Sequence, residues 1–329
     1  MRKIIVITSI FQPTEAIKSF AKLNNYELIV VGDKKSPKNW SEKNTCYLSI
    51  IDQEKQGFSL VEKLPFNHYS RKMIGYLKAF EKNAECIIDT DDDNIPKQNW
   101  SFPNFEGEFD CLDESLGFVN IYELFTEQKI WPRGLPLSLI NKKFDLESQL
   151  TVRECQVGIW QGLADEDPDV DAIYRLVSDK PCYFDKRKPV VLGRGTIAPF
   201  NTQNTLIRKE LFPLLYLPTY VTFRFTDILR GLIAQPIMWL YNYHLGFIDA
   251  TVIQKRNPHD YMKDFVSEIP MYKRSEDIID IVSNRICKTN TISDNLLLAY
   301  EALAKESIVS EEEIKTLEIW LKDISRIVK

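Results

Sequence analysis

The sequence predicts an α/β fold with a mostly parallel central sheet and flanking helices, on two observations. The first is that strand-like and helix-like segments alternate in the first third of the chain, which favours parallel strands joined by right-handed helical crossovers. The second is that polar residues follow three expected strands, as Thr8-Ser9, Gly32-Asp33 and the run from Asp89 to Asp93. Ligands of such sheets bind outside the carboxyl ends of the strands, so these residues mark the expected site.

Local patterns predict the individual elements of the first third. Apolar residues at 73, 74, 77 and 80 have the spacing of one helix face. Pro13 precedes another helical stretch as a start signal. These patterns predict helices at Thr14 to Leu23 and Tyr69 to Asn83, and strands at Lys3 to Ile7, Tyr26 to Val31, Cys46 to Ile51 and Cys86 to Ile88.

The middle of the chain, from about residue 100 to 265, has fewer regular patterns and many proline and aromatic residues. Several loops are expected there. The remaining patterns predict short strands at Phe118 to Tyr122 and Val190 to Leu192, and helices at Leu211 to Tyr216 and Asp227 to Ala234.

The C-terminal end is expected to be helical. Ser310 and Glu313 have the spacing of a capping box, in which each side chain accepts a hydrogen bond from a free backbone amide. We therefore predict a catalytic domain over residues 1–270 and a helical appendage over 271–329. The appendage either packs on the main domain or offers a surface to a partner or a membrane. The stretches with helical spacing are Ser275 to Cys287, Ser293 to Lys305 and Glu311 to Val328.

The composition argues against several classes of function. The chain has 329 residues, with 42 Lys and Arg against 47 Asp and Glu, and a net charge of −5. This balance argues against a nucleic-acid-binding protein that neutralises phosphates. No apolar run approaches the roughly 18 residues of a membrane-spanning helix, so none is expected. Six scattered cysteines and only three histidines argue against a disulfide framework, a zinc site and a histidine-rich metal centre.

Four carboxylates fall within the five residues from Asp89 to Asp93. Like charges at this separation raise one another's pKa, so such a cluster is tolerated where a cation compensates it. Because the cluster follows an apolar strand, we interpret it as a site for Mg²⁺ or Mn²⁺ with oxygen ligands; a solvated acidic loop is the alternative. The D-x-D pair of GT-A glycosyltransferases has this position and holds a metal on a diphosphate. An EF-hand is disfavoured by the loop spacing, and a D-x-D-x-T phosphatase would carry its motif after the first strand.

Seven short segments, in order along the chain, carry a resemblance to a known family. They are Thr8 to Ala16, Val30 to Pro37, Leu64 to Tyr76, Asp89 to Asn94, Asp167 to Leu176, Ala198 to Thr205, and Phe223 to Gly231. On these segments the chain resembles the STELLO glycosyltransferases and, more weakly, the reversibly glycosylated polypeptides, which are sugar-nucleotide mutases. The resemblance spans roughly residues 4–265 and leaves out the tail from 275 to 329.

The resemblance implies a GT-A fold and an enzyme that transfers a hexosyl or pentosyl group. The donor is expected to be a nucleoside diphosphate sugar, with UDP as the nucleotide, and the acceptor a saccharide or glycan. Plant members are membrane-anchored Golgi enzymes, and no such anchor is expected in this sequence. We therefore expect a bacterial enzyme of surface polysaccharide synthesis that is cytoplasmic or peripheral at the inner face of the membrane. Inversion and retention at the anomeric carbon both stay open.

Two sets of residues are expected to hold the donor on the family pattern. The metal, Mn²⁺ or Mg²⁺, is expected on Asp91, Asp93 and His259, since a late histidine commonly completes the metal site of GT-A enzymes. A basic pair that opens a helix would suit the diphosphate, although a surface pair is the alternative. The expected contacts of the nucleotide sugar are Thr8, Ile10, Pro13, Asp33, Arg71, Lys72, Asp91 and Asp92.

Asp227 is the candidate general base, which would take the proton of the acceptor hydroxyl as it attacks the anomeric carbon. Because Thr226-Asp227 opens an expected helix, an N-cap is the alternative interpretation. Asp169, Asp171 and Arg230 are the candidate acceptor ligands, and a solvated turn is the alternative for the two aspartates.

Other functions stay open at this point. A nucleotide-sugar mutase would isomerise the donor without an acceptor. A nucleotidyltransferase would want a Gly-rich basic loop after the first strand, and the sequence from Ser9 to Pro13 is not one. A catalytically silent scaffold would use the C-terminal helices to bind a partner.

Overall fold

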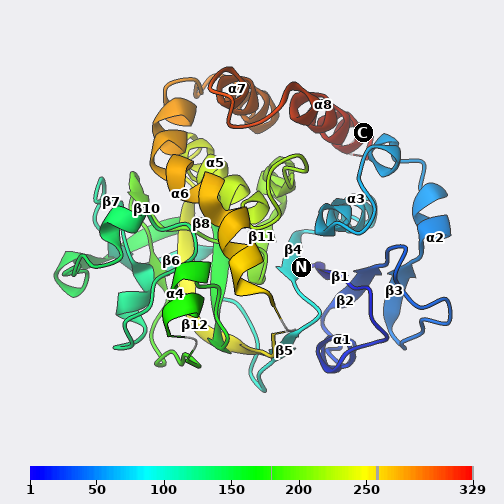
Figure 1. Ribbon diagram of the computed structural model, residues 1–329, viewed down its shortest axis with the longest axis horizontal. Helices are drawn as coiled ribbons and strands as arrows, with labels where there is room; N and C mark the ends of the chain where they lie inside the picture. Colours follow the sequence, from blue (N-terminus) through cyan, green and yellow to red (C-terminus); the bar gives the residue numbers. More distant parts are fainter. Residues whose placement is uncertain (179, 257–258, 328–329) are drawn as a thin grey trace.

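The computed structural model describes residues 1–178, 180–256 and 259–327, and it has the predicted α/β architecture (Figure 1). One large sheet has the strand order β3-β2-β1-β4-β11-β8-β6-β9-β12-β5, and β7 pairs with β10 in a small second sheet. The strands are β1 (Lys3–Thr8), β2 (Glu27–Val31), β3 (Thr45–Leu48), β4 (Cys86–Thr90), β5 (Asn94–Pro96), β6 (Glu106–Leu112), β7 (Gly117–Phe118), β8 (Leu150–Glu166), β9 (Val190–Val191), β10 (Thr196–Ile197), β11 (Asn204–Arg208) and β12 (His244–Gln254).

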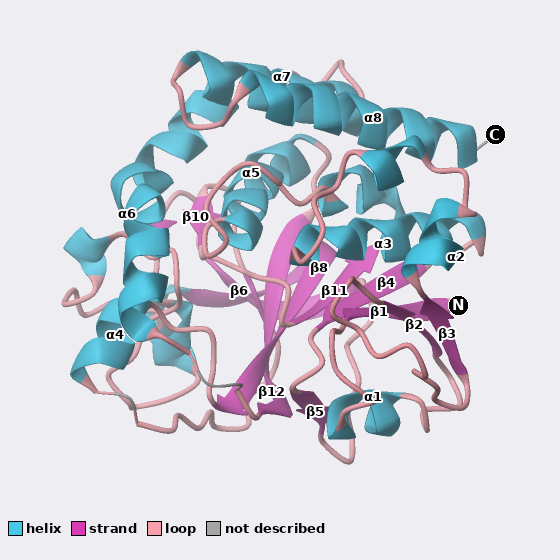
Figure 2. Ribbon diagram, turned by 45° about the vertical axis from the view of Figure 1, so that its right-hand side comes forward, coloured by secondary structure: helices cyan, strands magenta, loops and turns pink. Residues whose placement is uncertain are grey.

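Helices cover the sheet and form the end of the chain (Figure 2). None of the described helices combines the length and the apolar character that crossing a bilayer requires. The helices are α1 (Glu15–Phe20), α2 (Ile50–Glu54), α3 (Lys72–Glu81), α4 (Ala172–Val177), α5 (Thr226–Leu240), α6 (Tyr261–Ser283), α7 (Ile292–Lys305) and α8 (Glu311–Ile327).

The N-terminal strands form the predicted parallel part of the sheet. β1 lies between β2 and β4 and is parallel to both, and β3 extends this part parallel to β2. Helix α3 packs on β1 and β2. Gly75 allows this close approach, because a Cβ atom there would lie 2.6 Å from Cγ1 of Val6 and 2.8 Å from Cγ2 of Val31. The carboxyl ends of these strands therefore meet at one edge, as the sequence predicted.

The second part of the sheet is mixed, and sequence patterns identified little of it. β11 is antiparallel to both β4 and β8, whereas β8 and β12 are parallel to each other. The long strands β8 and β12 were not predicted. The strand predicted at Phe118 to Tyr122 is wrong beyond Phe118, because Ile121–Leu124 forms a 3₁₀ turn. The short strand near Val190 and the helix from Asp227 are confirmed.

The C-terminal helices pack on the main body rather than apart from it. In Figure 1, α7 and α8 lie across the top of the molecule. Trp320 of α8 is fully buried, and its Nε1 donates a hydrogen bond to the carbonyl of Pro213 at 3.0 Å. The boundary predicted at residue 270 falls inside α6, which runs through it from Tyr261 to Ser283. The division into two domains stays a prediction.

Glu313 departs from its predicted role as half of a capping box. The backbone amide of Glu313 does donate to Oγ of Ser310 at 3.3 Å. The Glu313 carboxylate, however, turns inward and is buried, and it accepts hydrogen bonds from the amides of Thr219 and Tyr220 and from the hydroxyl of Tyr216. Burial raises the pKa of this carboxyl group. Glu313 thus ties α8 to the loop that leads toward α5.

Replacement of Glu313 by alanine should destabilise the fold by about 3 kcal/mol or more, because it leaves buried amide and hydroxyl donors without acceptors. Glu318→Ala on the exposed side of the same helix is the matched control and should change stability by about 0.5 kcal/mol or less. Urea denaturation of both variants measures the difference. Equal stabilities would show that Glu313 does not hold this loop.

Candidate active site

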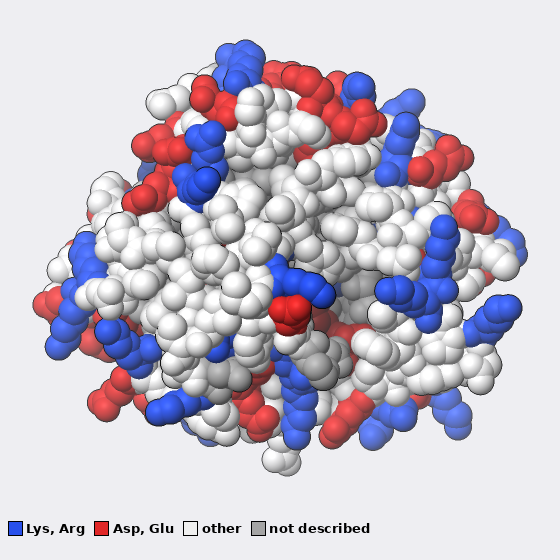
Figure 3. Space-filling view, viewed as in Figure 1, with Lys and Arg blue, Asp and Glu red and all other residues white. Residues whose placement is uncertain are grey.

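Two adjoining pockets open near the carboxyl ends of β1, β2 and β4, in a hollowed region of the face shown in Figure 3. Thr8, Tyr69, Asp92 and Phe223 line both. We call them the acidic pocket and the strand-end pocket. The acidic pocket is lined by Thr8, Tyr69, Asp91, Asp92, Asp93, Arg133, Asp169, Asn201, Thr202, Gln203, Phe223, Arg224, Asp227, Gln254, Arg256 and His259. The strand-end pocket is lined by Thr8, Ser9, Ile10, Phe11, Val31, Gly32, Asp33, Lys35, Asn67, His68, Tyr69, Arg71, Asp92 and Phe223.

Asp89 is the first and most deeply buried carboxylate of the acidic cluster. It lies in β4 with no solvent exposure. Lys72 of α3 donates from Nζ to one carboxylate oxygen of Asp89, and Arg230 of α5 donates from Nη1 to the other, both at 2.9 Å. A buried carboxylate is stable when it is both paired and hydrogen-bonded. Two cations from two helices therefore compensate the first charge of the acidic run.

The structure corrects the roles predicted for Lys72 and Arg230. Lys72 was expected to contact a diphosphate, but it is fully buried, and Nζ also donates to the carbonyl of Thr90 and the carboxylate of Asp91. Burial would lower the pKa of Lys72, but the charges of Asp89 and Asp91 raise it instead. Arg230 was expected to bind an acceptor, but it binds Asp89 and the carbonyl of Asn201. Neither side chain lines either pocket.

The next three carboxylates face the acidic pocket. Burial raises the pKa values of Asp91 and Asp92 to about 6, and it raises the pKa of Asp93 as well. Oγ of Ser9 donates to Asp92, and Oγ1 of Thr14 donates to the Asp92 carbonyl at 2.6 Å. These bonds fix the loop after β4 against the start of α1. The protein thus holds three carboxylates where ionisation is costly, unless a cation joins them.

Asp91 and Asp93 have the donor chemistry that a hard divalent cation requires. Among residues 1–178, 180–256 and 259–327, the buried Oδ1 of Asp93 has no hydrogen-bond partner, and Oδ2 accepts one long bond of 3.3 Å, from Nε2 of Gln254. In the described part of the chain, no three His, Cys, Asp or Glu side chains are grouped tightly enough to hold a metal by themselves. Mg²⁺, however, is usually bound by one or two carboxylates together with substrate phosphates. The two aspartates therefore fit a metal that arrives with a phosphorylated ligand.

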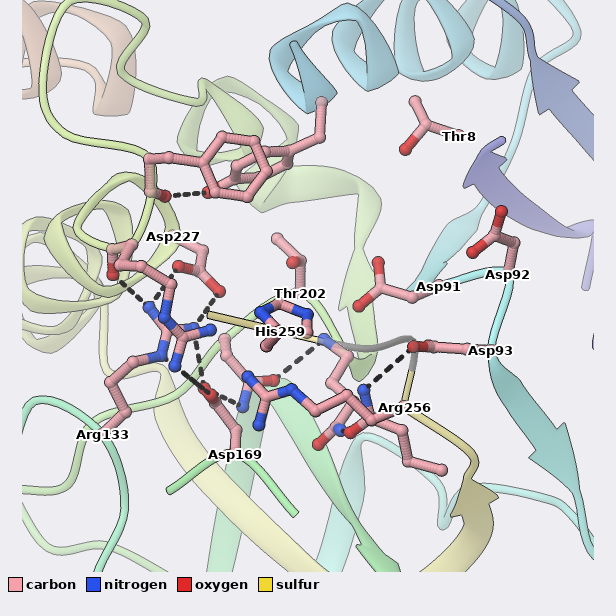
Figure 4. Close-up of a pocket in the computed structure, with 16 residues that line it drawn as sticks. Thr8, Asp91, Asp92, Asp93, Arg133, Asp169, Thr202, Asp227, Arg256 and His259 are labelled. Carbon is pink, nitrogen blue, oxygen red and sulfur yellow. Dashed lines mark hydrogen bonds and ion pairs between the residues drawn. The ribbon is translucent and has the colours of Figure 1, made fainter. Parts of the chain in front are cut away.

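The opposite wall of the acidic pocket is built on Arg133 (Figure 4). Its guanidinium makes two hydrogen bonds to Asp169 and two to Asp227, all between 2.8 and 2.9 Å. Nδ2 of Asn201 also donates to Asp169, at 2.8 Å. In Figure 4, this network lies across the pocket from Asp91, Asp92 and Asp93, with Arg256 and His259 between the two groups.

Asp227, the candidate base, lies in the pocket as an ionised carboxylate. Burial would raise the pKa of Asp227, but the Arg133 guanidinium outweighs burial and lowers it. Asp227 is therefore ionised at neutral pH, the form that a base needs, although a low pKa makes it a weaker base. It lies in the first turn of α5, where Phe225 holds the N-cap position, and among the described backbone amides its side chain accepts from that of Ile228 alone.

The other residues that were expected to bind the nucleotide sugar lie mostly around the strand-end pocket. Thr8, Ile10, Asp33 and Arg71 line the strand-end pocket, whereas Pro13 lines neither pocket. Asp33 accepts a hydrogen bond from the amide of Asn67 at 2.7 Å, which connects the ends of β2 and the loop before α3. The Arg71 guanidinium is committed mostly to structure, because it donates to Oε1 of Gln53 and to the carbonyl of Leu64.

Two predicted acceptor residues and the late histidine also have defined positions. Asp169 lines the acidic pocket, but Asp171 does not. Asp171 instead caps α4 by accepting from the amide of Tyr174 at 2.9 Å, and it accepts from Nε1 of Trp131 at 2.8 Å. This buried cap corrects the expectation that Asp171 binds an acceptor. His259 lines the acidic pocket, with Nδ1 2.9 Å from Oδ2 of Asp264.

Sequence reasoning missed most of the basic and amide side chains of the acidic pocket. Asn201, Thr202, Gln203 and Arg224 fall within the segments that carry the family resemblance, so those segments contained a usable signal. Arg133, which lies in none of them, has no comparable signal.

The mixed α/β sheet with its flanking helices is consistent with a fold of the GT-A type, and the acidic pocket lies at the carboxyl ends of its parallel strands. A family model described as STELLO glycosyltransferases matches residues 224–328. Two curated proteins of Arabidopsis thaliana are similar to the chain over 98% of its length, "Probable glycosyltransferase STELLO1" at 27% identity and "Probable glycosyltransferase STELLO2" at 26%. These matches confirm the resemblance to the STELLO glycosyltransferases.

The matches also define the extent of the similarity. The chain spans 44% of the length of each of these two relatives, which is less than half. The family match runs to residue 328, whereas the resemblance read from the sequence ended near residue 265. The helices α7 and α8 therefore lie inside the family match, and the expectation that they fall outside it was wrong.

Replacement of Lys72 by methionine should destabilise the protein by about 3–5 kcal/mol, because it leaves the buried carboxylate of Asp89 with one cation instead of two. Lys78→Met on the same helix removes a partly exposed pair with Glu81 and should cost about 1 kcal/mol or less. Denaturant unfolding compares the two. A Lys72 variant as stable as the Lys78 variant would show that Lys72 is not needed to compensate the buried charge of Asp89.

Proposed function

We propose that the chain is a metal-dependent glycosyltransferase that moves a sugar from a nucleoside diphosphate donor, UDP in the first instance, to a carbohydrate acceptor. The observation that carries this proposal is that Asp91 and Asp93 face a pocket that adjoins a second pocket at the ends of β1 and β2. Such a pair of sites suits a ligand with a diphosphate and a nucleoside at its two ends. The names of the two relatives, both probable glycosyltransferases, support the same class.

In this proposal Asp91 and Asp93 hold Mn²⁺ or Mg²⁺ together with the donor phosphates, and His259 is a further candidate ligand. When bound, the metal would neutralise charge on the leaving nucleoside diphosphate. Lys72 keeps Asp91 oriented from beneath, through the bond between Nζ and Oδ1 at 2.9 Å. Ser9 and Thr14 hold Asp92 and its backbone beside them.

The nucleoside would occupy the strand-end pocket, between Thr8, Ile10 and Asp33. The two pockets adjoin at an aromatic pair, because Tyr69 and Phe223 line both, with ring centroids 4.7 Å apart in an edge-on contact. The transferred sugar would then lie beyond them, near Asp169 and Asp227.

The biological setting belongs to the same proposal. A cytoplasmic bacterial enzyme of surface polysaccharide synthesis is one setting for this chemistry, although the two relatives named above are plant proteins. Hexosyl or pentosyl transfer, the stereochemical course and any partner of the C-terminal helices also stay predictions.

Asp93→Ala should weaken Mn²⁺-dependent UDP binding at least about tenfold, or roughly 1.4 kcal/mol, because it removes a carboxylate with one free buried oxygen. Asp280→Asn, at an exposed position of α6, is the charge-matched control and should bind as the unaltered chain does. Titration calorimetry with and without Mn²⁺ measures both. Unchanged metal-dependent binding by the Asp93 variant would refute the metal assignment.

Asp227→Asn should lower kcat by about 100-fold or more while the dissociation constant of the donor stays the same, since a general base contributes in this range. The asparagine has the shape of Asp227 and can accept one of the two hydrogen bonds that Arg133 donates there, so it is the smallest change available at this position. Rates and donor affinities are measured side by side on the isosteric variant. Full activity would exclude Asp227 as the base, and a parallel loss of donor binding would assign it a structural role.

A further inference from the structure

Arg256 is the least committed cation of the acidic pocket. It follows β12, and its side chain is only 9% exposed. Among the described residues, its guanidinium makes one ion pair, with Asp167 at 3.5 Å, and no hydrogen bond. Arg133 in the same pocket makes four short bonds to carboxylates. Arg256 therefore keeps most of its five N–H donors available to the pocket that it lines.

The carboxylate nearest to Arg256 is shared with another cation. Arg175 also pairs with Asp167, and more closely than Arg256 does. One carboxylate thus faces two guanidinium groups. Asp169 and Asp264 also act on the charge of Arg256, but no described residue makes a hydrogen bond to its guanidinium.

The neighbouring arginines add positive charge rather than compensation. Arg224 and Arg133 line the same pocket, and Arg224 is held by the buried carboxylate of Glu268 at 2.8 Å. Burial lowers the pKa of Arg256, and repulsion from Arg224 lowers it further. In Figure 4, Arg256 lies between the Arg133 network and Asp93, and its charge acts to lower the pKa of Asp93. An anion bound by Arg256 would therefore lie beside the carboxylates that are expected to hold a metal.

We propose that Arg256, together with Arg224, forms an oxyanion subsite that binds a phosphate or carboxylate group of the substrate. The proposal rests on the proposed function, since it assigns a ligand group to the same pocket. A guanidinium can give two parallel hydrogen bonds to either kind of oxyanion. The group has two sources in a glycosyl transfer: the phosphates of the donor, or an acidic substituent on one of the two sugars.

Titration calorimetry of the full chain with Mn²⁺ present tests the subsite and distinguishes its sources. The ligands are inorganic diphosphate, UDP, UDP-glucose, UDP-glucuronic acid and free glucuronate. Arg256→Gln removes the charge, and Arg256→Lys keeps the charge but loses the planar pair of N–H donors. Arg285→Gln, at an exposed position in the turn after α6, is the control. Arg256→Gln should weaken at least one oxyanion about 10- to 100-fold, Arg256→Lys should weaken it less, and the control should not change.

Each pattern of loss has one meaning. If Arg256→Gln weakens the binding of UDP and diphosphate, the subsite binds the donor phosphates. If it weakens only the binding of UDP-glucuronic acid and glucuronate, the subsite binds an acidic sugar. Equal binding of every anion by Arg256→Gln and the control overturns the proposal. If the unaltered chain binds diphosphate through Arg256 but binds no nucleotide, the subsite stands and the proposed function fails.

Discussion

The paired burial of Asp89 between Lys72 and Arg230 is the interaction on which the rest of the site depends. It joins three elements at one point, because Lys72 comes from α3, Asp89 from β4 and Arg230 from α5. None of the three charges is tolerable alone in the interior. Their mutual compensation fixes the end of β4 relative to both helices, and that end carries the loop of Asp91, Asp92 and Asp93.

The charges of the molecule are therefore compensated in layers. The first carboxylate of the acidic run is paired inside the protein, and Lys72 shares its charge with Asp91. Asp91 and Asp93 have raised pKa values, and a buried oxygen of Asp93 has no partner in the part of the chain that the structure describes. Across the pocket, Arg133 is saturated by Asp169 and Asp227, while Arg256 is not saturated. Among the described residues, the pocket thus holds a carboxylate oxygen and a guanidinium whose hydrogen-bonding capacity is not used within the protein.

Local patterns predicted the elements that depend on local sequence. The strands around Ile5, Ile29 and Ile87 are continuous apolar runs, and each was found close to its true position. The strand β8 was missed because its first half is polar and exposed, and only its pairing with β6, β11 and β12 keeps it extended. Such pairing over long distances leaves no periodic signal in one sequence.

In the site, too, local sequence patterns predicted some features, whereas others depend on tertiary contacts. The position of Asp91 and Asp93 after a strand was enough to predict the acidic pocket. The direction of a side chain was not predictable, so Lys72 was assigned to a ligand although it points into the core. Glu313 fits a local capping pattern. Its carboxylate nevertheless accepts hydrogen bonds from two amides of a loop far away in the sequence.

The most direct test of the central claim is a crystal structure of the chain with UDP and Mn²⁺, with anomalous scattering used to locate the metal. We expect an anomalous peak for a Mn²⁺ ion that is bound by carboxylate oxygens of Asp91 and Asp93 and by the diphosphate, with Lys72 still paired to Asp89. A nucleotide bound without metal at these aspartates, or a metal bound elsewhere, would contradict it.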